Sequence, residues 1–104
     1  LADRTTRYEE ALGYISRAYA QKPDDPAIID SLGWVHFRLG NYDEARQHLQ
    51  RAWDMTQDGE IGAHLGEVMW VQGDHDEARA IWEASRKSSP DNPVLLEVIN
   101  RYSP

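Results

Sequence analysis

Cysteine is absent from this sequence, which excludes disulfides, thiolate metal sites and cysteine nucleophiles. No apolar run approaches the roughly 18 residues that a membrane-spanning helix needs, so we expect no direct membrane insertion of this segment. Positive charge is scarce, because 11 Lys and Arg residues oppose 18 Asp and Glu residues, for a net charge of −7. Since the few cations are scattered along the chain, the composition argues against binding to nucleic acid.

The remaining composition is that of an ordinary globular protein. Hydrophobic residues make up 40% and charged residues 28% of the sequence, as in typical globular proteins. The length of 104 residues predicts a single domain over residues 1–104. Four Trp and five Tyr residues supply aromatic mass for a core.

The sequence repeats itself internally. The segment 40–46 (GNYDEAR) recurs at 73–79 (GDHDEAR), and Leu32-Gly33 recurs as Leu65-Gly66 at the same offset of about 33 residues. The segment 8–11 (YEEA) likewise precedes its counterpart YDEA by about 34 residues. Several matches in one register indicate a repeat and not chance similarity.

The segments between the repeated turns are predicted to be helices, near residues 7–21, 26–39, 42–55, 59–72, 75–88 and 93–102. Asp25 and Asn92 are suited to cap the helices that follow them. Gly40 and Gly73 suit helix ends that need a positive φ. Because the linkers are only a few residues long, successive helices should pack antiparallel.

This pattern resembles the tetratricopeptide repeat, whose period is about 34 residues. The matching positions in one unit are Leu32, Gly33, Gly40, Tyr42, Ala45, Leu49 and Ala52. In the next unit they are Leu65, Gly66, Gly73, Ala78, Trp82 and Pro90. The resemblance implies an all-α fold of antiparallel helix-turn-helix repeats stacked in a right-handed superhelix, and a protein-protein interaction scaffold.

The repeat register divides the chain into four parts. Residues 1–25 are a partial repeat, mainly its second helix, 26–58 and 59–92 are full repeats, and 93–104 are a capping helix and tail. Leu1-Ala2 would end a helix that is otherwise missing, so the helix at 7–21 should leave a face uncovered, with some of Tyr14, Ile15, Ala18 and Tyr19.

Packing between helices is expected to depend on small residues where they cross. Gly33 and Gly66 let neighbouring helices approach closely, and large apolar side chains fill the space between repeats. In the capping helix, Leu95, Leu96 and Ile99 are expected to pack inward.

A narrower resemblance concerns residues 1–4 (LADR) followed by 8–11 (YEEA), and residues 24–35 (DDPAIIDSLGWV). These segments are similar to the C-terminal repeats of proteobacterial tetratricopeptide lipoproteins. Some members of that group are outer-membrane lipoproteins that act as adaptors for a carboxy-terminal processing protease. The resemblance implies a location on the periplasmic side of the outer membrane and that protease as a partner. Without it, the expected compartment is the cytoplasm.

Arrays of this family present a concave face lined by the first helix of each pair. Transfer of the family's groove positions gives these contact residues for a partner: Asp30, Trp34, Phe37, Arg38, Ala63, Glu67, Trp70, Val71 and Arg101. The transferred positions also include Ala27, and the last helix could add Glu97. Trp34 and Trp70 are the most informative members, because aromatic side chains in a groove are typical hot spots.

The alternative interpretation of Trp34 and Phe37 is packing against the neighbouring unit, since periodicity alone does not separate the two faces. Trp53 and Trp82 lie on second helices and are expected in the core.

Some members of the family clamp a terminal carboxylate with Lys, Asn and Arg. Here Asp30 and Trp34 stand at such positions and only Arg38 fits, so this clamp is disfavoured. An apolar or aromatic segment with a basic residue that meets Asp30 or Glu67 is the better expectation.

No catalytic or metal-binding pattern emerges. The sequence has no His pair at i,i+3 or i,i+4, no Gly-rich phosphate loop and no nucleophile elbow. The cluster Asp74-His75-Asp76 is interpreted as a solvated helix start with Asp74 as its cap. Pairs such as Asp43-Glu44 complement the dipole at helix starts. We therefore expect a non-enzymatic protein without a cofactor.

Two functions remain from this reasoning. The first is a scaffold whose concave face binds an extended or helical segment of another protein. The alternative is a self-associating structural module, a homo-oligomer formed through the truncated N-terminal face.

Overall fold

The computed structural model of the protein describes residues 4–102, with side chains from residue 6 onward. Within that range the helices are α1 (Arg4–Gln21), α2 (Pro26–Arg38), α3 (Tyr42–Met55), α4 (Gly59–Val71), α5 (His75–Ser88) and α6 (Pro93–Tyr102). The predicted helices are confirmed, and the largest difference is that α1 begins three residues before the expected start at 7. The helix end expected at Leu1-Ala2 lies outside the described residues. No helix in the described range is long and apolar enough to cross a bilayer.

The helix ends follow from local side-chain chemistry. The carboxylate of Asp25 accepts a hydrogen bond of 2.9 Å from a backbone N–H in the first turn of α2. The side-chain oxygen of Asn92 accepts two such bonds, of 3.0 and 3.1 Å, in α6. Gly40 and Gly73 end their helices with φ of +83° and +93°, a region that side chains with a Cβ rarely adopt.

Arg46 of α3 ties one repeat to the next. Its guanidinium pairs with Asp74 and, at 2.8 Å, with Glu77, and it donates a bond of 3.0 Å to Gln72. The side chain of Asp74 makes no capping bond to α5. The prediction that Asp74 caps α5 was therefore wrong, because its carboxylate is used in the contact between repeats.

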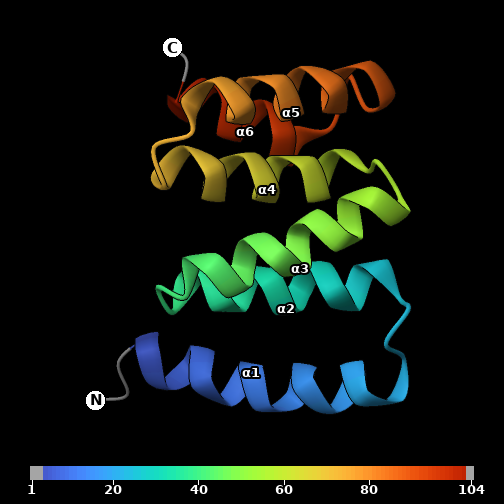
Figure 1. Cartoon of the computed structure of the whole chain (residues 1–104), viewed down its shortest axis with the longest axis vertical. Helices are drawn as coiled ribbons and strands as arrows, with labels where there is room; N and C mark the ends of the chain where they lie inside the picture. Colours follow the sequence, from blue (N-terminus) through green and yellow to red (C-terminus); the bar gives the residue numbers. More distant parts are fainter. Residues whose placement is uncertain (1–3, 103–104) are drawn as a thin grey trace.

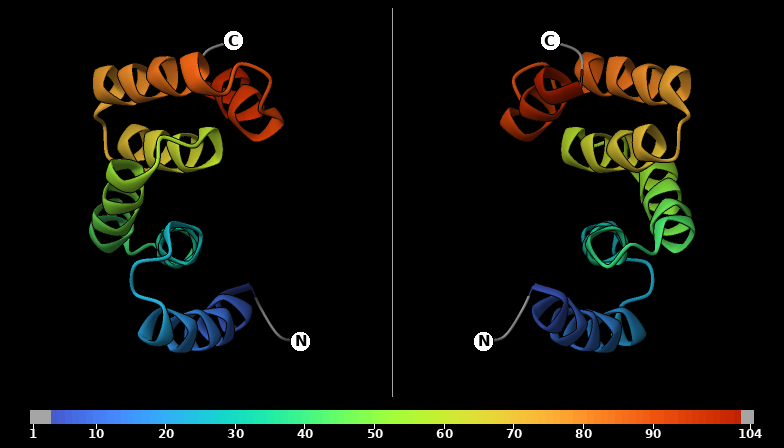
Figure 2. Two further views of the ribbon diagram at one scale, coloured as in Figure 1. Left: turned by 90° about the vertical axis from the view of Figure 1, so that its right-hand side faces the viewer. Right: turned by 90° about the vertical axis from the view of Figure 1, so that its left-hand side faces the viewer.

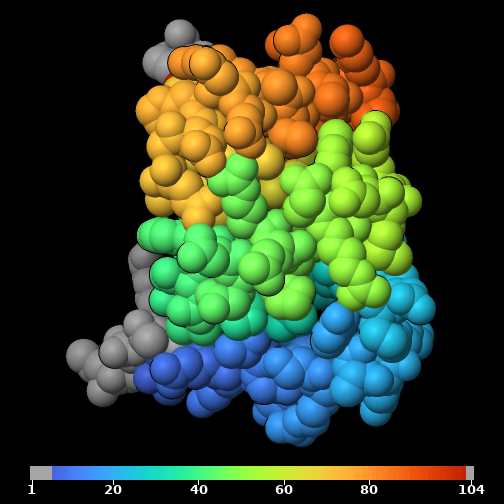
Figure 3. Space-filling model, in the orientation of Figure 1, coloured from blue at the N-terminus to red at the C-terminus, as the bar shows by residue number. Residues whose placement is uncertain are grey.

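The helices form a curved stack. Figure 1 shows the chain rising from α1 at one end to α5 and α6 at the other, with neighbouring helices antiparallel. The side views in Figure 2 show a C shape, in which α2, α4 and α6 lie on the inner side and α3 and α5 on the outer side. Figure 3 shows the outer face, in which α3 and α5 lie above α1, whose blue atoms form the lower end. The inner side is thus formed by the first helix of each successive pair.

Close approach at glycine holds each pair together, as the sequence predicted. A Cβ at Gly33 would lie 2.7 Å from Cγ of Leu49, and a Cβ at Gly66 would lie 2.1 Å from Nε1 of Trp82. Leu49 and Trp82 are both buried. A side chain at either glycine would therefore displace the core of its helix pair.

The two ends of the stack differ in how well their apolar side chains are covered. In α6, Leu95 and Val98 are buried, whereas Leu96 is 36% exposed and Ile99 is partly buried. The expectation that Leu96 packs inward was wrong, since the helix turns Val98 toward α4 instead. On α1, Tyr14 is 68% exposed, in agreement with the uncovered face expected there.

Candidate functional site

A cleft of about 290 Å³ lies on the inner side of the curved stack. Four helices line it, and the residues are Tyr8 of α1, Trp34 and Arg38 of α2, His64 and Glu67 of α4, and Val94, Glu97, Val98 and Arg101 of α6. Trp34, Glu67 and Arg101 occupy corresponding positions in successive repeats. The same position of the repeat therefore lines the cleft in α2, in α4 and in α6.

An aromatic wall forms the end of the cleft nearest α1. The rings of Trp34 and His64 stack with centroids 4.2 Å apart, and the guanidinium of Arg38 lies 5.5 Å from the Trp34 centroid. Nε of Arg38 donates a bond of 3.1 Å to the hydroxyl of Tyr8. These contacts join α1, α2 and α4, and they leave Trp34 only partly buried.

A buried polar pair lies behind this wall. Nδ1 of His64 is 2.9 Å from Oδ1 of Asp30, and both side chains are almost fully buried. Asp30 lines a second hollow of about 270 Å³, which it shares with Ala27, Asp58 and Glu60. Asp30 lines this hollow and His64 lines the cleft, so the bond between them joins the two linings and orients the ring that stacks on Trp34.

A carboxylate forms the opposite end of the cleft. Glu67 is only 3% exposed. Its Oε2 accepts bonds from Nη1 of Arg101 (3.0 Å) and from the hydroxyl of Tyr102 (2.7 Å), while Nη2 of Arg101 donates to Glu97 at 3.1 Å. The Glu67 carboxylate raises the pKa of Arg101, and burial, followed by the bond to Glu67, raises the pKa of Tyr102. Among the described side chains, none donates a hydrogen bond to Oε1 of Glu67.

Of the contact residues transferred from the family, the structure brings Trp34, Arg38, Glu67 and Arg101 to the cleft. Phe37 and Ala63 lie in the core instead, and Val71 is exposed outside the cleft lining. Trp53 and Trp82 are buried, which confirms the core position expected for the tryptophans of second helices.

Trp70 does not line the cleft. It corresponds to Phe37 of the preceding repeat, and each packs against the first residue of the helix that follows. The Trp70 and His75 rings stack with centroids 3.9 Å apart, and the Phe37 and Tyr42 centroids are 5.5 Å apart. Trp70 also lies 5.7 Å from Trp82 between ring centroids. This repeat position therefore faces the seam between helices.

Sequence reasoning missed Tyr8 and His64. His64 lies three residues before Glu67, so helical periodicity placed it on the same face of α4, and this signal was available. Tyr8 reaches the cleft only because α1 packs beside α2 and its hydroxyl meets Arg38, which no local pattern indicates.

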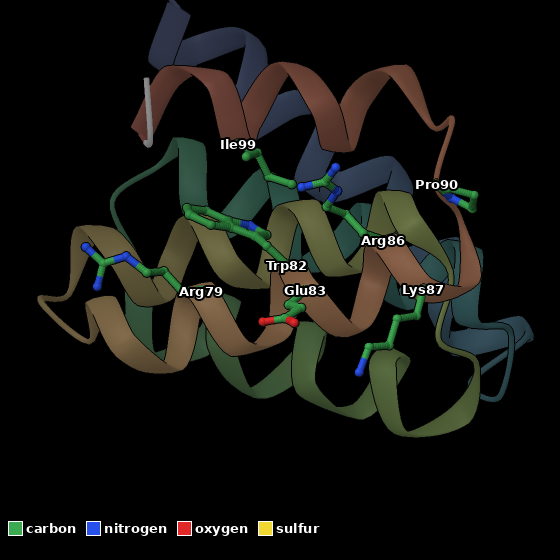
Figure 4. A pocket seen from close by; sticks show the side chains of 7 residues that line it. All are labelled: Arg79, Trp82, Glu83, Arg86, Lys87, Pro90 and Ile99. Atoms are coloured by element: carbon green, nitrogen blue, oxygen red, sulfur yellow. The ribbon is translucent and has the colours of Figure 1, made fainter.

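A second crevice, of about 420 Å³, lies between α5 and α6 at the end of the stack. Figure 4 shows Arg86 directed toward Ile99 and Trp82, whereas Arg79 and Lys87 extend away from them. Although this crevice has the larger volume, it contains none of the predicted contact residues. The inner cleft is therefore the better candidate site, because four helices converge on it.

The side chains of the cleft are suited to binding. They offer an indole, an imidazole, two guanidinium groups and two carboxylates, together with apolar valines. Within the described residues, no group of three or more His, Cys, Asp or Glu side chains could hold a metal ion.

Comparison with known proteins places the chain among helical repeat proteins. Residues 5–65 and 39–101 each match the family model of the tetratricopeptide repeat. A TPR repeat-containing protein of Pseudomonas aeruginosa is 51% identical over 67 residues, which cover 64% of this chain and 11% of that protein. The crystal structure of a thermophilic TPR protein from Thermus thermophilus is similar with a TM-score of 0.82 and 26% identity, over 99% of this chain and 53% of that one. The chain thus spans only a small part of the first relative and about half of the second.

Proposed function

This chain belongs to the tetratricopeptide repeat family, and we propose that its inner cleft binds a segment of a partner polypeptide, so that the protein serves as an interaction scaffold. The observation that carries the proposal is the convergence of four helices on one cleft with a partly exposed tryptophan in its wall. Aromatic side chains at the centre of such surfaces contribute much of the binding energy. The small volume of the cleft suits a few side chains of an extended or helical segment.

The finer role that we propose is that of an adaptor for a carboxy-terminal processing protease on the periplasmic side of the outer membrane. Its support is the resemblance of residues 24–35 to the repeats of proteobacterial lipoproteins, some of which have that role. The substrate-binding and protease-binding surfaces of such an adaptor would lie on more than this chain, which spans only part of its relatives.

The alternative function is self-association through the face of α1. Its support is Tyr14, which is 68% exposed on a helix whose Leu12 and Ile15 are only partly buried. Contacts between two such faces would remove apolar surface from water. Size-exclusion chromatography with light scattering distinguishes the two functions by molar mass. Self-association requires a stable dimer, and Tyr14→Asp should convert that dimer to a monomer.

The cleft is tested by affinity capture from a cell-envelope extract with three matched proteins. The first is the chain itself, the second carries Trp34→Ala with Arg38→Ala in the cleft, and the third carries Gln47→Ala with Gln50→Ala on the outer face of α3. Circular dichroism establishes first that all three are folded.

We expect a partner that the first and third proteins retain and the second loses. A processing protease among the captured proteins would support the finer role. A partner retained equally by all three would move the interface away from the cleft and contradict the proposal.

A further inference from the structure

We propose that the cleft recognises a basic side chain, Lys or Arg, of the bound polypeptide, and that Glu67 receives its charged group. This inference rests on the proposed function, because it names the chemistry of the partner at the same cleft. It sharpens the sequence-based expectation of a basic residue at Asp30 or Glu67, because Glu67 lines the cleft whereas Asp30 is already paired with His64.

Glu67 is a buried carboxylate with one oxygen that accepts no hydrogen bond from the described side chains. Arg101 and Tyr102 both donate to its Oε2, while Oε1 receives no bond from the described side chains, although Glu67 is only 3% exposed. Buried polar atoms are nearly always hydrogen-bonded, and an ionised acceptor is among the most costly to leave unpaired. Since Oε1 is enclosed, a ligand reaches it only by replacing Arg101 at this carboxylate, where a cation with several donors can bond both oxygens.

The charge of the inner side agrees with a cationic ligand. The cleft itself is lined by two carboxylates, Glu67 and Glu97, and two guanidinium groups, Arg38 and Arg101. The neighbouring hollow adds three carboxylates and no Lys or Arg, namely Asp30, Asp58 and Glu60, so the two hollows together carry an excess of negative charge. The crevice between α5 and α6 has the opposite balance, with Arg79, Arg86 and Lys87 against Glu83. Electrostatic complementarity thus directs a basic segment to the inner side and away from the end of the stack.

Arg101 already shows what kind of group this end of the cleft accommodates. Its guanidinium bridges Glu67 and Glu97, yet its side chain is 50% exposed, against 4% for Glu67. Because the Arg101 side chain is exposed, it can turn aside when another cation takes its place, whereas the buried carboxylate of Glu67 must keep a partner. A basic side chain of the partner would then contact both carboxylates in the place that Arg101 occupies.

The remaining lining fits the stem of such a side chain. Val94 and Val98 of α6 and the partly exposed ring of Trp34 line the same cleft as the two carboxylates. Lys and Arg pack their methylene groups along apolar surface while the charged end meets a polar partner. At the other end of the cleft, Arg38 offers its guanidinium to a carbonyl or carboxylate of the same segment.

The test is a selection of random ten-residue peptides displayed on phage against the immobilised chain. We expect enriched peptides with Lys or Arg at one aligned position. Enrichment of peptides without a basic residue would overturn the inference while leaving binding in the cleft intact. If no peptide were enriched above the unselected pool, the proposed function itself would fail, and the inference with it.

The position of the cation is then tested with one enriched peptide and isosteric variants. Glu67→Gln removes the charge with little change in shape, and Glu83→Gln removes the same charge at the α5–α6 crevice as a control. We expect Glu67→Gln to weaken the peptide about 10- to 100-fold, as loss of a charge-assisted hydrogen bond does, and Glu83→Gln to leave it unchanged.

A double-mutant cycle distinguishes recognition from a structural role of Glu67. Replacement of the basic peptide residue by norleucine should cost the same factor against the wild-type chain and nothing further against Glu67→Gln. Arg101→Gln should strengthen the basic peptide about two- to fivefold, because the internal competitor is gone. Additive losses in the cycle, or weaker binding by Arg101→Gln, would overturn the inference.

Discussion

Replacement of Gly66 by alanine examines the packing that holds α4 against α5. The added Cβ would lie 2.1 Å from Nε1 of Trp82 and 2.6 Å from two of its ring carbons. The indole is confined, because it is buried and lies between the rings of Trp70 (5.7 Å) and Tyr102 (5.9 Å), measured between centroids. Either the ring or the helix must shift to make room.

The expected magnitude is the balance of two effects. Overpacking of a well-filled core costs about 1–3 kcal/mol, and a rigid ring so close to the new carbon favours the upper part of that range. The higher helix propensity of alanine offsets about 1 kcal/mol of this cost relative to glycine. We therefore expect Gly66→Ala to lower the free energy of unfolding by about 1–2 kcal/mol.

Gly13 is the matched control, since it lies inside α1 and a Cβ there would meet nothing within 4 Å. Gly13→Ala should raise the free energy of unfolding by about 0.5–1 kcal/mol from helix propensity alone. Urea denaturation followed by circular dichroism measures both variants, with unchanged slopes as the sign that only stability has moved. Stabilisation of similar size by both substitutions would refute the packing of Trp82 over Gly66.

Three further predictions use the same denaturation assay. Leu65→Ala should cost about 2–5 kcal/mol, because Leu65 is fully buried, and a loss below about 1 kcal/mol would mean that the repeat register is wrong. Arg46→Gln should cost about 1 kcal/mol at low ionic strength by loosening the contact with Asp74, and the difference should shrink in high salt. Burial, and then the charge of His36, lower the pKa of His48, so the unfolded chain takes up this proton at higher pH than the folded protein. Stability should therefore fall as the pH drops below about 6.5, and His48→Gln should make that fall shallower, whereas an identical pH profile would contradict the assignment.

The inner cleft shows how much repeat symmetry alone predicts about which side chains face a partner. Trp34 and Glu67 are equivalent positions and both line the cleft, whereas Phe37 and Trp70 are equivalent positions and both pack at the seam between helices. The sequence aligned each pair correctly. It placed all four on one face, because three residues make nearly a full helical turn and the two positions lie only about 60° apart around the axis, which periodicity does not separate.

The sequence by itself determined the helices, their ends and the positions of closest approach. These features are local, since a cap such as Asp25, a positive-φ glycine such as Gly40 and the repeat period act within one or two turns of the chain. The resemblance to the family rested on the same features, namely a period of about 34 residues and the small residues at matching positions.

Only the tertiary structure decided which side chains meet across the repeats. Asp30 with His64, and Glu67 with Arg101, are pairs separated by 34 residues, and their contact depends on how far the stack curves. Curvature is the sum of small rotations at every helix interface, set by side-chain volumes that differ between repeats. No local pattern in the sequence encodes this curvature. For this reason only the folded chain reveals that, among the described residues, Oε1 of Glu67 has no hydrogen-bond donor.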